Sequence, residues 1–339
     1  MRRASAFLAM LLLAPWLFAC APMLAPPGPA HTEPHLIERP LGPLRLVTAD
    51  GYELLMRRWM PEGEPRAVIL ALHGFNDHST FVEDAALAWE QLGIATYAYD
   101  QRGFGTAPNR GLWAGSAAYK ADASAALRLL AARHPGVPLY LLGESMGGAI
   151  AMVTLAEYPD LPVEGAVLAA PAVWARETMP GYQRIALLLA SYSVPWFPLS
   201  GKSLKIQASD NLEALRELSS DPLVIKETRV DAVHGLADLM DEAMASAPHY
   251  ATPSLLLYGA KDELVPEEPM LRLWRRLSED TRESQRLALY DNGWHLLFRD
   301  LEAGLVIEDV AVWISDPTAP LPSAADAFAT ERLAAAQED

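Results

Sequence analysis

The sequence predicts an α/β protein with a mostly parallel, doubly wound sheet and a helical insertion. Short apolar segments of strand length alternate with segments of helical periodicity over residues 44–173 and again over residues 251–316. Between them, residues 174–250 contain helical stretches without a convincing strand of the sheet. With 339 residues, 51% of them hydrophobic, the chain is long enough for one large domain with such an insertion.

The expected strands begin with a hairpin. Residues 44–48 and 52–60 flank Asp50-Gly51, a pair typical of hairpin turns. The later strands are apolar runs that suit burial on both faces of a parallel sheet. In chain order they cover residues 67–72, 94–99, 139–142, 163–170, 254–258 and 286–290.

The expected helices lie between these strands and are bounded by residues that start or stop helices. Ser116 can cap a helix that runs to about residue 134, and Pro135-Gly136 ends it. In chain order the expected helices cover residues 81–92, 116–134, 146–157, 266–277 and 305–314. This alternation places helices on both faces of the sheet.

Charge and composition exclude several kinds of partner. Lys and Arg number 27 against 43 Asp and Glu, a net charge of −16, which argues against nucleic acid because phosphate binding needs a basic surface. No Cys/His cluster has metal-ligand spacing: His73 and His78 lie close together, but no third ligand accompanies them. We therefore expect no metal and no cofactor, and expect both histidines to shape their loop by hydrogen bonding.

The N-terminus has the pattern of a signal peptide. Two arginines precede the apolar segment 6–18, which is too short for a comfortable membrane span. The segment leads into Leu17-Phe18-Ala19-Cys20, which resembles a bacterial lipobox, and Cys20 is the one cysteine of the chain. We expect residues 1–19 to be a lipoprotein signal peptide and Cys20 to be the acylated first residue of the mature chain. An ordinary signal peptide that contains a cysteine is the alternative.

The segments that flank the predicted fold differ in character. Residues 20–43 are rich in proline and are expected to form an extended tether between the membrane and the fold. Because Ala21 rather than an acidic residue follows the cysteine, resemblance to other lipoproteins implies the cell envelope, at the outer membrane of a two-membrane bacterium. Residues 317–339 form a polar, alanine-rich tail with room for one more helix.

A serine lies where a buried strand is expected to meet a helix. Residues 139–149 read LYLLGESMGGA, and Gly143 and Gly147 leave room for a strained backbone at Ser145. The helix start offers free N–H groups to a developing oxyanion. A Gly/Ser turn before a helix is the simple alternative, but this context predicts a nucleophile elbow with Ser145 as the nucleophile.

A serine hydroxyl needs a base, and the base needs a group that fixes its tautomer. In this architecture the acid and then the histidine follow the serine, at the carboxyl ends of later strands. Asp262 and His295 each follow an expected strand. Asp291 is the nearest rival acid, but it is too close in sequence to His295 to approach it from a neighbouring strand. The predicted triad is therefore Ser145, Asp262 and His295.

The oxyanion hole is expected to combine two backbone N–H groups. One belongs to Met146, the residue after the nucleophile. The other comes from the loop after an early strand, where Phe75 follows His73-Gly74.

Four segments resemble a known family. Residues 44–316 resemble an α/β-hydrolase, and within that superfamily they are similar to the monoacylglycerol lipase and lysophospholipase group, also described as serine aminopeptidase-like hydrolases. The segments are HGFNDHS at 73–79, YDQRGFG at 99–105, GESMGG at 143–148 and GAKDELVP at 259–266. Glu144 and Phe104 each replace a histidine that is usual in the group. Neither is a triad position, so these departures bear on substrate preference.

The resemblance implies that residues 174–250 form a helical cap over the active site. The cap contains the apolar segment 185–189, followed by Tyr192, Val194, Pro195, Trp196, Phe197 and Pro198. These residues are apolar enough to line an acyl channel or touch a membrane surface, and packing against the sheet is the alternative.

The implied function is hydrolysis of carboxylic esters of single-acyl lipids, monoacylglycerols or lysophospholipids, through an acyl-enzyme intermediate. The expected partners are this substrate and a membrane, reached through the N-terminal lipid anchor. A carboxylesterase for small soluble esters is the alternative, and a peptidase or a non-catalytic lipoprotein is less favoured.

Overall fold

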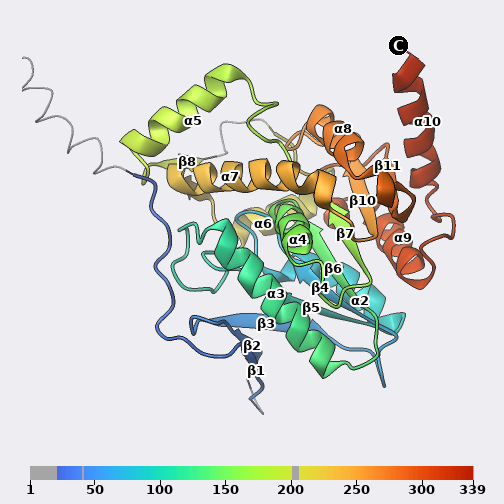
Figure 1. The fold of residues 1–339 in the computed structure, drawn as a ribbon, viewed down its shortest axis with the longest axis horizontal. Helices are drawn as coiled ribbons and strands as arrows, with labels where there is room; N and C mark the ends of the chain where they lie inside the picture. Colours follow the sequence, from blue (N-terminus) through green and yellow to red (C-terminus); the bar gives the residue numbers. More distant parts are fainter. Residues whose placement is uncertain (1–20, 40–41, 201–205, 339) are drawn as a thin grey trace, which may run out of the picture.

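A nine-stranded sheet forms the centre of the computed structural model, which describes residues 21–39, 42–200 and 206–338 (Figure 1). The strand order is β1-β2-β3-β5-β4-β6-β7-β10-β11. The strands are β1 (His35–Ile37), β2 (Leu44–Val47), β3 (Glu53–Trp59), β4 (Ala67–Leu72), β5 (Ile94–Tyr99), β6 (Leu139–Glu144), β7 (Gly165–Ala169), β10 (Ser254–Gly259) and β11 (Gln285–Tyr290). Pairing is antiparallel from β1 to β5 and parallel from β5 to β11. The predicted α/β class is confirmed.

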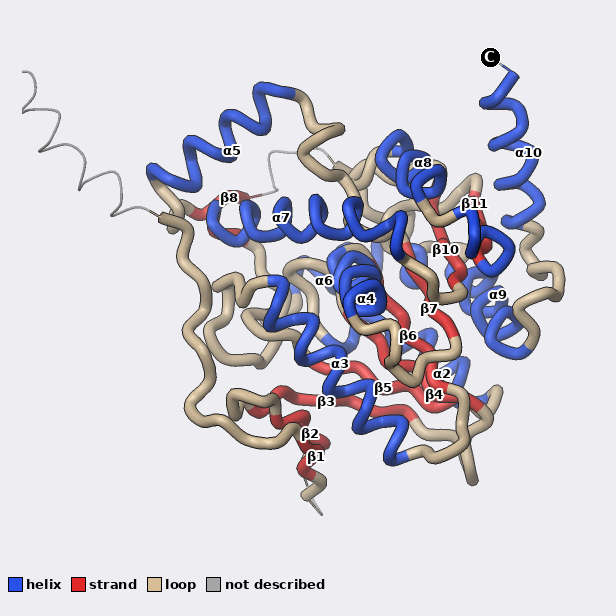
Figure 2. Tube along the Cα trace, viewed as in Figure 1, coloured by secondary structure: helices blue, strands red, loops and turns tan. Residues whose placement is uncertain are grey.

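Helices cover both faces of the sheet, as Figure 2 shows. The helices of the core are α2 (Glu83–Gln91), α3 (Ser116–Arg133), α4 (Met146–Glu157), α8 (Glu267–Arg276) and α9 (Ala303–Ser315), with the short 3-10 helices η1 (Ser79–Val82) and η5 (Leu297–Arg299). Side chains of β4 alternate between the two layers: Val68, Leu70 and Leu72 pack with α3 and α4, whereas Ala67 and Ile69 pack with α2 and α9. The strand is buried on both faces, as its continuous apolar run predicts.

The insertion between β7 and β10 is mostly helical. It contains α5 (Gly181–Ser193), α6 (Leu212–Ser220) and α7 (Val230–Ser246), and α7 packs on α4 of the core. Two short strands, β8 (Pro198–Ser200) and β9 (Glu227–Arg229), pair with each other outside the central sheet. The insertion therefore lies above the helix that begins at Met146, and we call residues 174–250 the cap.

The proline-rich N-terminal segment lies along the fold instead of projecting from it (Figure 1). The N–H of Ala25 donates to the carbonyl of Trp113 at 2.7 Å, and the N–H of Met23 donates to Asp231 of α7 at 3.3 Å. Further along, β1 adds to the sheet beside β2, a strand that the sequence did not predict. The predictions for the signal peptide and for Cys20 lie outside the described residues.

The C-terminal tail is anchored as well. Helix α10 (Ala325–Glu338) packs on β11, and Arg286 pairs with Asp326 at 2.8 Å. None of the helices in the described part of the chain is both long and apolar enough to span a membrane.

Candidate active site

Ser145 occupies a strained turn between β6 and α4. Its backbone has φ 54° and ψ −115°, a region that residues other than glycine rarely adopt. The flanking glycines are required by space: a Cβ at Gly143 would lie 2.3 Å from the carbonyl oxygen of Gly147, and one at Gly147 would lie 2.0 Å from that of Leu72. Only glycine fits at these two positions, so the Gly-x-Ser-x-Gly spacing follows from the packing of the turn.

Backbone hydrogen bonds hold this turn against the loop after β7. The N–H of Ser145 donates to the carbonyl of Ala169, and the carbonyl of Ser145 accepts from the N–H of Ala172, both at 2.9 Å. Glu144 and Met146 on either side are fully buried, whereas Ser145 is partly exposed. The turn therefore presents the serine to solvent while it buries both neighbours.

Asp262 and His295 meet at the carboxyl ends of β10 and β11. His295 Nδ1 lies 2.7 Å from Asp262 Oδ2, with 3% and 0% of the two side chains exposed. Asp262 Oδ1 accepts hydrogen bonds from the N–H groups of Leu264 and Val265, at 2.8 and 2.9 Å, which fix the carboxylate. Asp291, the rival acid, is exposed in the turn after β11. The structure thus brings together Asp262 and His295, the pair that the sequence predicted.

The contact with Asp262 sets the charge and tautomer of His295. Burial lowers the pKa of His295, but the charge of Asp262 and its hydrogen bond raise it more, with further contributions from Glu144 and Asp300, so the pKa lies above its usual value. Because Nδ1 faces the carboxylate, it carries the proton, and Nε2 is left to act as a base.

The loop after β4 lies against Ser145. A Cβ at Gly74 would be 3.4 Å from Ser145 Cβ, which places the next residue, Phe75, beside the elbow. His73 braces this loop: its Nδ1 donates to the Gly74 carbonyl at 2.8 Å, and its Nε2 accepts from the N–H of Gln101 at 3.0 Å.

Two backbone donors are free at this position. In the described part of the chain, the N–H groups of Phe75 and Met146 have no hydrogen-bond acceptor. Unpaired N–H groups at the start of a helix and in the facing loop suit a developing oxyanion. These are the two groups to which the sequence analysis assigned the oxyanion hole, and that assignment stays a prediction.

The elbow, the Asp–His pair and the facing loop agree with a comparison against protein families. Residues 63–302 match the family described as serine aminopeptidase, S33, and this match spans more than half of the chain. The chain belongs to this family.

Individual relatives extend the match. Human monoglyceride lipase is 28% identical over 279 residues, which cover 81% of this chain and 90% of the human enzyme. The monoacylglycerol lipase of Mycolicibacterium smegmatis is 27% identical over 270 residues, covering 78% of this chain and 93% of that enzyme. A soluble variant of monoglyceride lipase from Saccharomyces cerevisiae superposes with a TM-score of 0.67 at 21% identity, over 87% of this chain and 100% of the yeast chain. The chain has the α/β-hydrolase fold and is a carboxylic ester hydrolase.

The two departures from the usual motifs of the group have definite places in the hydrolase. Phe104 packs edge-on against both His73 and Phe75, with ring centroids 5.6 Å apart in each case. It therefore supports the loop that carries the Phe75 N–H. Glu144 is fully buried beside the nucleophile.

Residues of the cap hold the same loop from above, a feature that the sequence did not predict. His78 Nε2 lies 2.8 Å from Asp221 Oδ2, and Asn76 Nδ2 donates to Thr228 Oγ1 at 2.7 Å. Asp221 and Thr228 lie in the middle of the cap, far from any recognisable motif, so no spacing in the sequence identifies them.

Proposed function

We propose that the chain hydrolyses esters of single-acyl lipids, monoacylglycerols or lysophospholipids, through an acyl-enzyme on Ser145. Ser145 Oγ attacks the ester carbonyl carbon while its proton passes to His295 Nε2, and Asp262 stabilises the imidazolium through Nδ1. The N–H groups of Phe75 and Met146 bind the oxyanion. His295 then protonates the departing alcohol. Water attacks the acyl group in the second half, again with His295 as the base, and the proton returns to Ser145.

The observation that carries this proposal is the buried contact of 2.7 Å between His295 Nδ1 and Asp262 Oδ2. Both residues follow parallel strands of the central sheet, and Ser145 follows β6 of the same sheet. All three therefore lie at the carboxyl ends of these strands. A protein that only bound lipid would have no use for a tautomer-fixing carboxylate there.

A preference for lipid is supported by the exposed apolar residues of the cap. Within α5 only Ser191 is buried, although the helix is rich in large apolar side chains. The exposed apolar side chains of α5 and the following segment are Tyr182, Ile185, Leu188, Leu189, Tyr192, Val194, Trp196, Phe197 and Leu199. These residues do not pack against the sheet, which leaves lipid contact as the better explanation of their character. We call this set the apolar cap surface.

Anchoring through Cys20 is part of the same proposal. The N–H of Met23 donates to Asp231 at the start of α7, so the segment just after Cys20 contacts the cap (Figure 1). A lipid on the residue before Ala21 would therefore enter the membrane on the side of the apolar cap surface. With Ala21 after the cysteine, we propose the outer membrane of a two-membrane bacterium as the location.

A hydrolysis panel tests the substrate. Monoacylglycerols, lysophospholipids, short soluble p-nitrophenyl esters and an amino-acid p-nitroanilide are compared by kcat/KM, with the wild type and Ser145→Ala. We expect the single-acyl lipids to be preferred and the variant to lose activity by about 10⁴-fold or more. A preference for the short soluble esters would replace the lipase with a carboxylesterase, and cleavage of the anilide alone would indicate a peptidase.

The mass of the mature N-terminus tests the anchor. We expect membrane fractions to contain a chain that begins at Cys20 and carries acyl groups. An unmodified chain that begins elsewhere would make the protein a secreted hydrolase and leave the catalytic proposal in place.

A further inference from the structure

Glu144 is a buried carboxyl group that the proposed mechanism does not use. It immediately precedes the nucleophile, no part of it is exposed, and neither of its carboxylate oxygens has a hydrogen-bond partner in the described part of the chain. Burying a carboxyl group without hydrogen-bond partners destabilises the folded state. Its position therefore calls for an explanation beyond packing.

The side chain of Glu144 points beneath the catalytic loops. In β6, residues alternate between the two faces, so Glu144 shares a face with Tyr140 and Leu142. Both belong to the apolar layer that includes Leu297 and Phe298 of η5, just after His295. Glu144 Oε1 also lies 3.8 Å from where a Cβ of Gly74 would be. The carboxyl group thus lies between the loop that holds the base and the loop that holds the Phe75 N–H.

Charged groups reach Glu144 from each of these elements. Asp77 comes from the loop after β4, His295 from the loop after β11, and Arg299 and Asp300 from η5 and its end. Arg299 already has an ion-pair partner, because its Nη1 lies 2.6 Å from Asp77 Oδ2. Among these groups, His295 is the one whose charge changes during turnover in the proposed mechanism.

We propose that Glu144 is a positioning residue that acts through His295: its carboxylate supplies a second negative charge, besides Asp262, that stabilises the imidazolium formed when Ser145 is acylated. The proposal rests on the proposed function, in which His295 is the base. Glu144 exchanges no proton with the substrate; its own ionisation, set by pH, determines how strongly His295 holds a proton.

Glu144 and His295 each shift the pKa of the other. Burial is the largest influence on Glu144 and raises its pKa to about 7, with Arg299 and His295 opposing that rise. The charge of Glu144 in turn contributes to the raised pKa of His295, together with Asp262 and Asp300.

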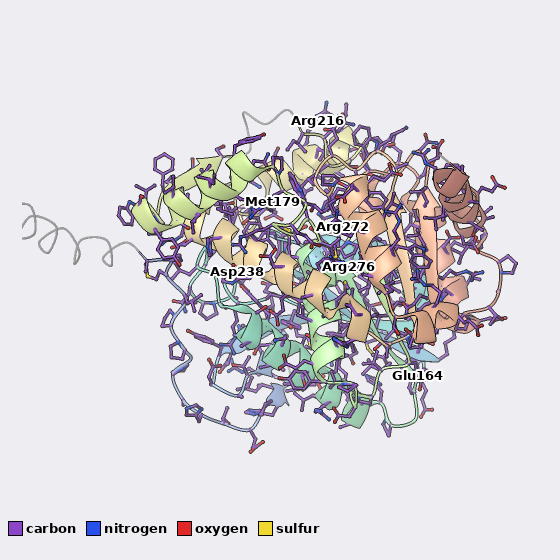
Figure 3. The ribbon with its side chains drawn as sticks, turned by 45° about the horizontal axis from the view of Figure 1, so that its top comes forward. Glu164, Met179, Arg216, Asp238, Arg272 and Arg276 are labelled. Atoms are coloured by element: carbon purple, nitrogen blue, oxygen red, sulfur yellow. The ribbon has the colours of Figure 1, made fainter. Side chains whose placement is uncertain are left out.

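The test compares pH profiles of kcat/KM on a short soluble ester for the wild type, Glu144→Gln, Glu144→Asp and Glu164→Gln. Glu164→Gln is the control, because it removes the same charge at a distant position. Glu164 is exposed just before β7, at the opposite end of the strands, and Figure 3 shows it well away from Met179 of the cap. We expect the acid limb of Glu144→Gln to move to lower pH by up to about half a unit, because only the ionised fraction of Glu144 in the wild type favours the imidazolium. Glu144→Asp restores the limb toward that of the wild type, and Glu164→Gln leaves it in place.

An acid limb that stays in place in Glu144→Gln, with only a lower melting temperature, would overturn the proposal and leave Glu144 a structural residue. Titration of the His295 ring by NMR gives an independent readout in the wild type and in whichever Glu144 variant folds. The hydrolysis assay and the titration together distinguish failure of the proposed function from failure of this inference. Absence of ester hydrolysis in the wild type contradicts the proposed function, whereas a His295 pKa that is equal in the wild type and the variant contradicts the inference about Glu144.

Discussion

Arg299 Nη1 lies 2.6 Å from Asp77 Oδ2, and this ion pair joins two loops of the active site. Arg299 lies four positions after His295, and Asp77 lies two positions after Phe75. With 13% and 10% of the side chains exposed, the pair is largely removed from water. It therefore holds the loop that carries His295 against the loop that carries Phe75.

Removing one member of this pair is expected to damage catalysis on every ester. In Arg299→Met the buried Asp77 loses its partner, and the loop that carries the Phe75 N–H is no longer held in place. Since loss of one oxyanion donor costs about 10²–10³ in kcat, displacement of the loop is expected to lower kcat by roughly tenfold or more. Steady-state kinetics on a soluble ester measure this. Arg272→Met is the control, because Arg272 pairs with Glu268 on the exposed side of α8. Equal kcat values for the two variants would show that the Asp77 contact has no catalytic role.

Exchange of the two candidate acids tests the triad. Asp262→Asn leaves an amide next to His295 Nδ1 and favours the wrong tautomer, so we expect kcat to fall by about 10⁴-fold. Asp291→Asn changes an exposed turn residue and is expected to keep nearly full activity. Kinetics of both variants on one ester decide the matter, and the reverse order of effects would make Asp291 the acid.

The pH dependence of the wild type follows from the raised pKa of His295. Burial opposes the shift, and the charge and hydrogen bond of Asp262 outweigh it, so the pKa of His295 lies above its usual value. Only the neutral ring can accept the proton of Ser145, so kcat/KM is expected to fall about tenfold per unit as the pH drops below this pKa. A profile of kcat/KM from pH 5 to 9 measures the limb. Full activity maintained below pH 6 would contradict the coupling between His295 and Asp262.

The positions of Ser145, Asp262 and His295 in the fold could be predicted because local rules determine them. Ser145 lies between two glycines that the packing of the turn requires, and Asp262 and His295 each lie in the loop after a strand with a strong apolar pattern. Because β10 and β11 are parallel neighbours, the loops that carry Asp262 and His295 lie side by side at the carboxyl ends of these strands.

Other features depend on contacts between distant parts of the chain, which no local pattern encodes. Asp77 and Arg299 are 222 residues apart, and each alone reads as an ordinary charged loop residue. Strand β1 lies in a proline-rich segment and is a strand only because β2 offers it a free edge. The burial of Glu144 likewise depends on η5 and on the loop after β4, which both lie far from it in the sequence.

A second buried ion-pair cluster is expected to contribute to stability rather than to catalysis. Arg102 contacts both Asp122 and Asp50, with Nε 2.5 Å from Asp122 Oδ2 and Nη1 2.6 Å from Asp50 Oδ2. In Arg102→Met the buried Asp122 loses its ion-pair partner, whereas Asp50 keeps hydrogen bonds from Thr48 and Gly28. The free energy of unfolding is expected to fall by about 3–5 kcal/mol. Arg128→Met removes an exposed pair with Asp160 and is expected to cost less than about 1 kcal/mol. Urea unfolding of the two variants measures the difference, and equal midpoints would contradict the assigned role of Arg102.

The apolar cap surface makes the last prediction. Ile185 and Leu189 are one turn apart on α5, and each is 61% exposed. The double variant Ile185→Ser, Leu189→Ser therefore replaces two neighbouring exposed apolar side chains with polar ones. If this surface meets lipid, the double variant is expected to bind phospholipid vesicles several-fold more weakly, because apolar contact with the bilayer interface is lost. Its kcat/KM on a short soluble ester stays near that of the wild type, since neither residue lies in the proposed catalytic machinery. Leu87→Ser, at an exposed apolar position of α2 away from the cap, is the matched control. Vesicle co-sedimentation, performed with chains that lack the acyl anchor, isolates the contribution of the protein surface. Unchanged binding by the double variant would show that the cap does not contact the membrane.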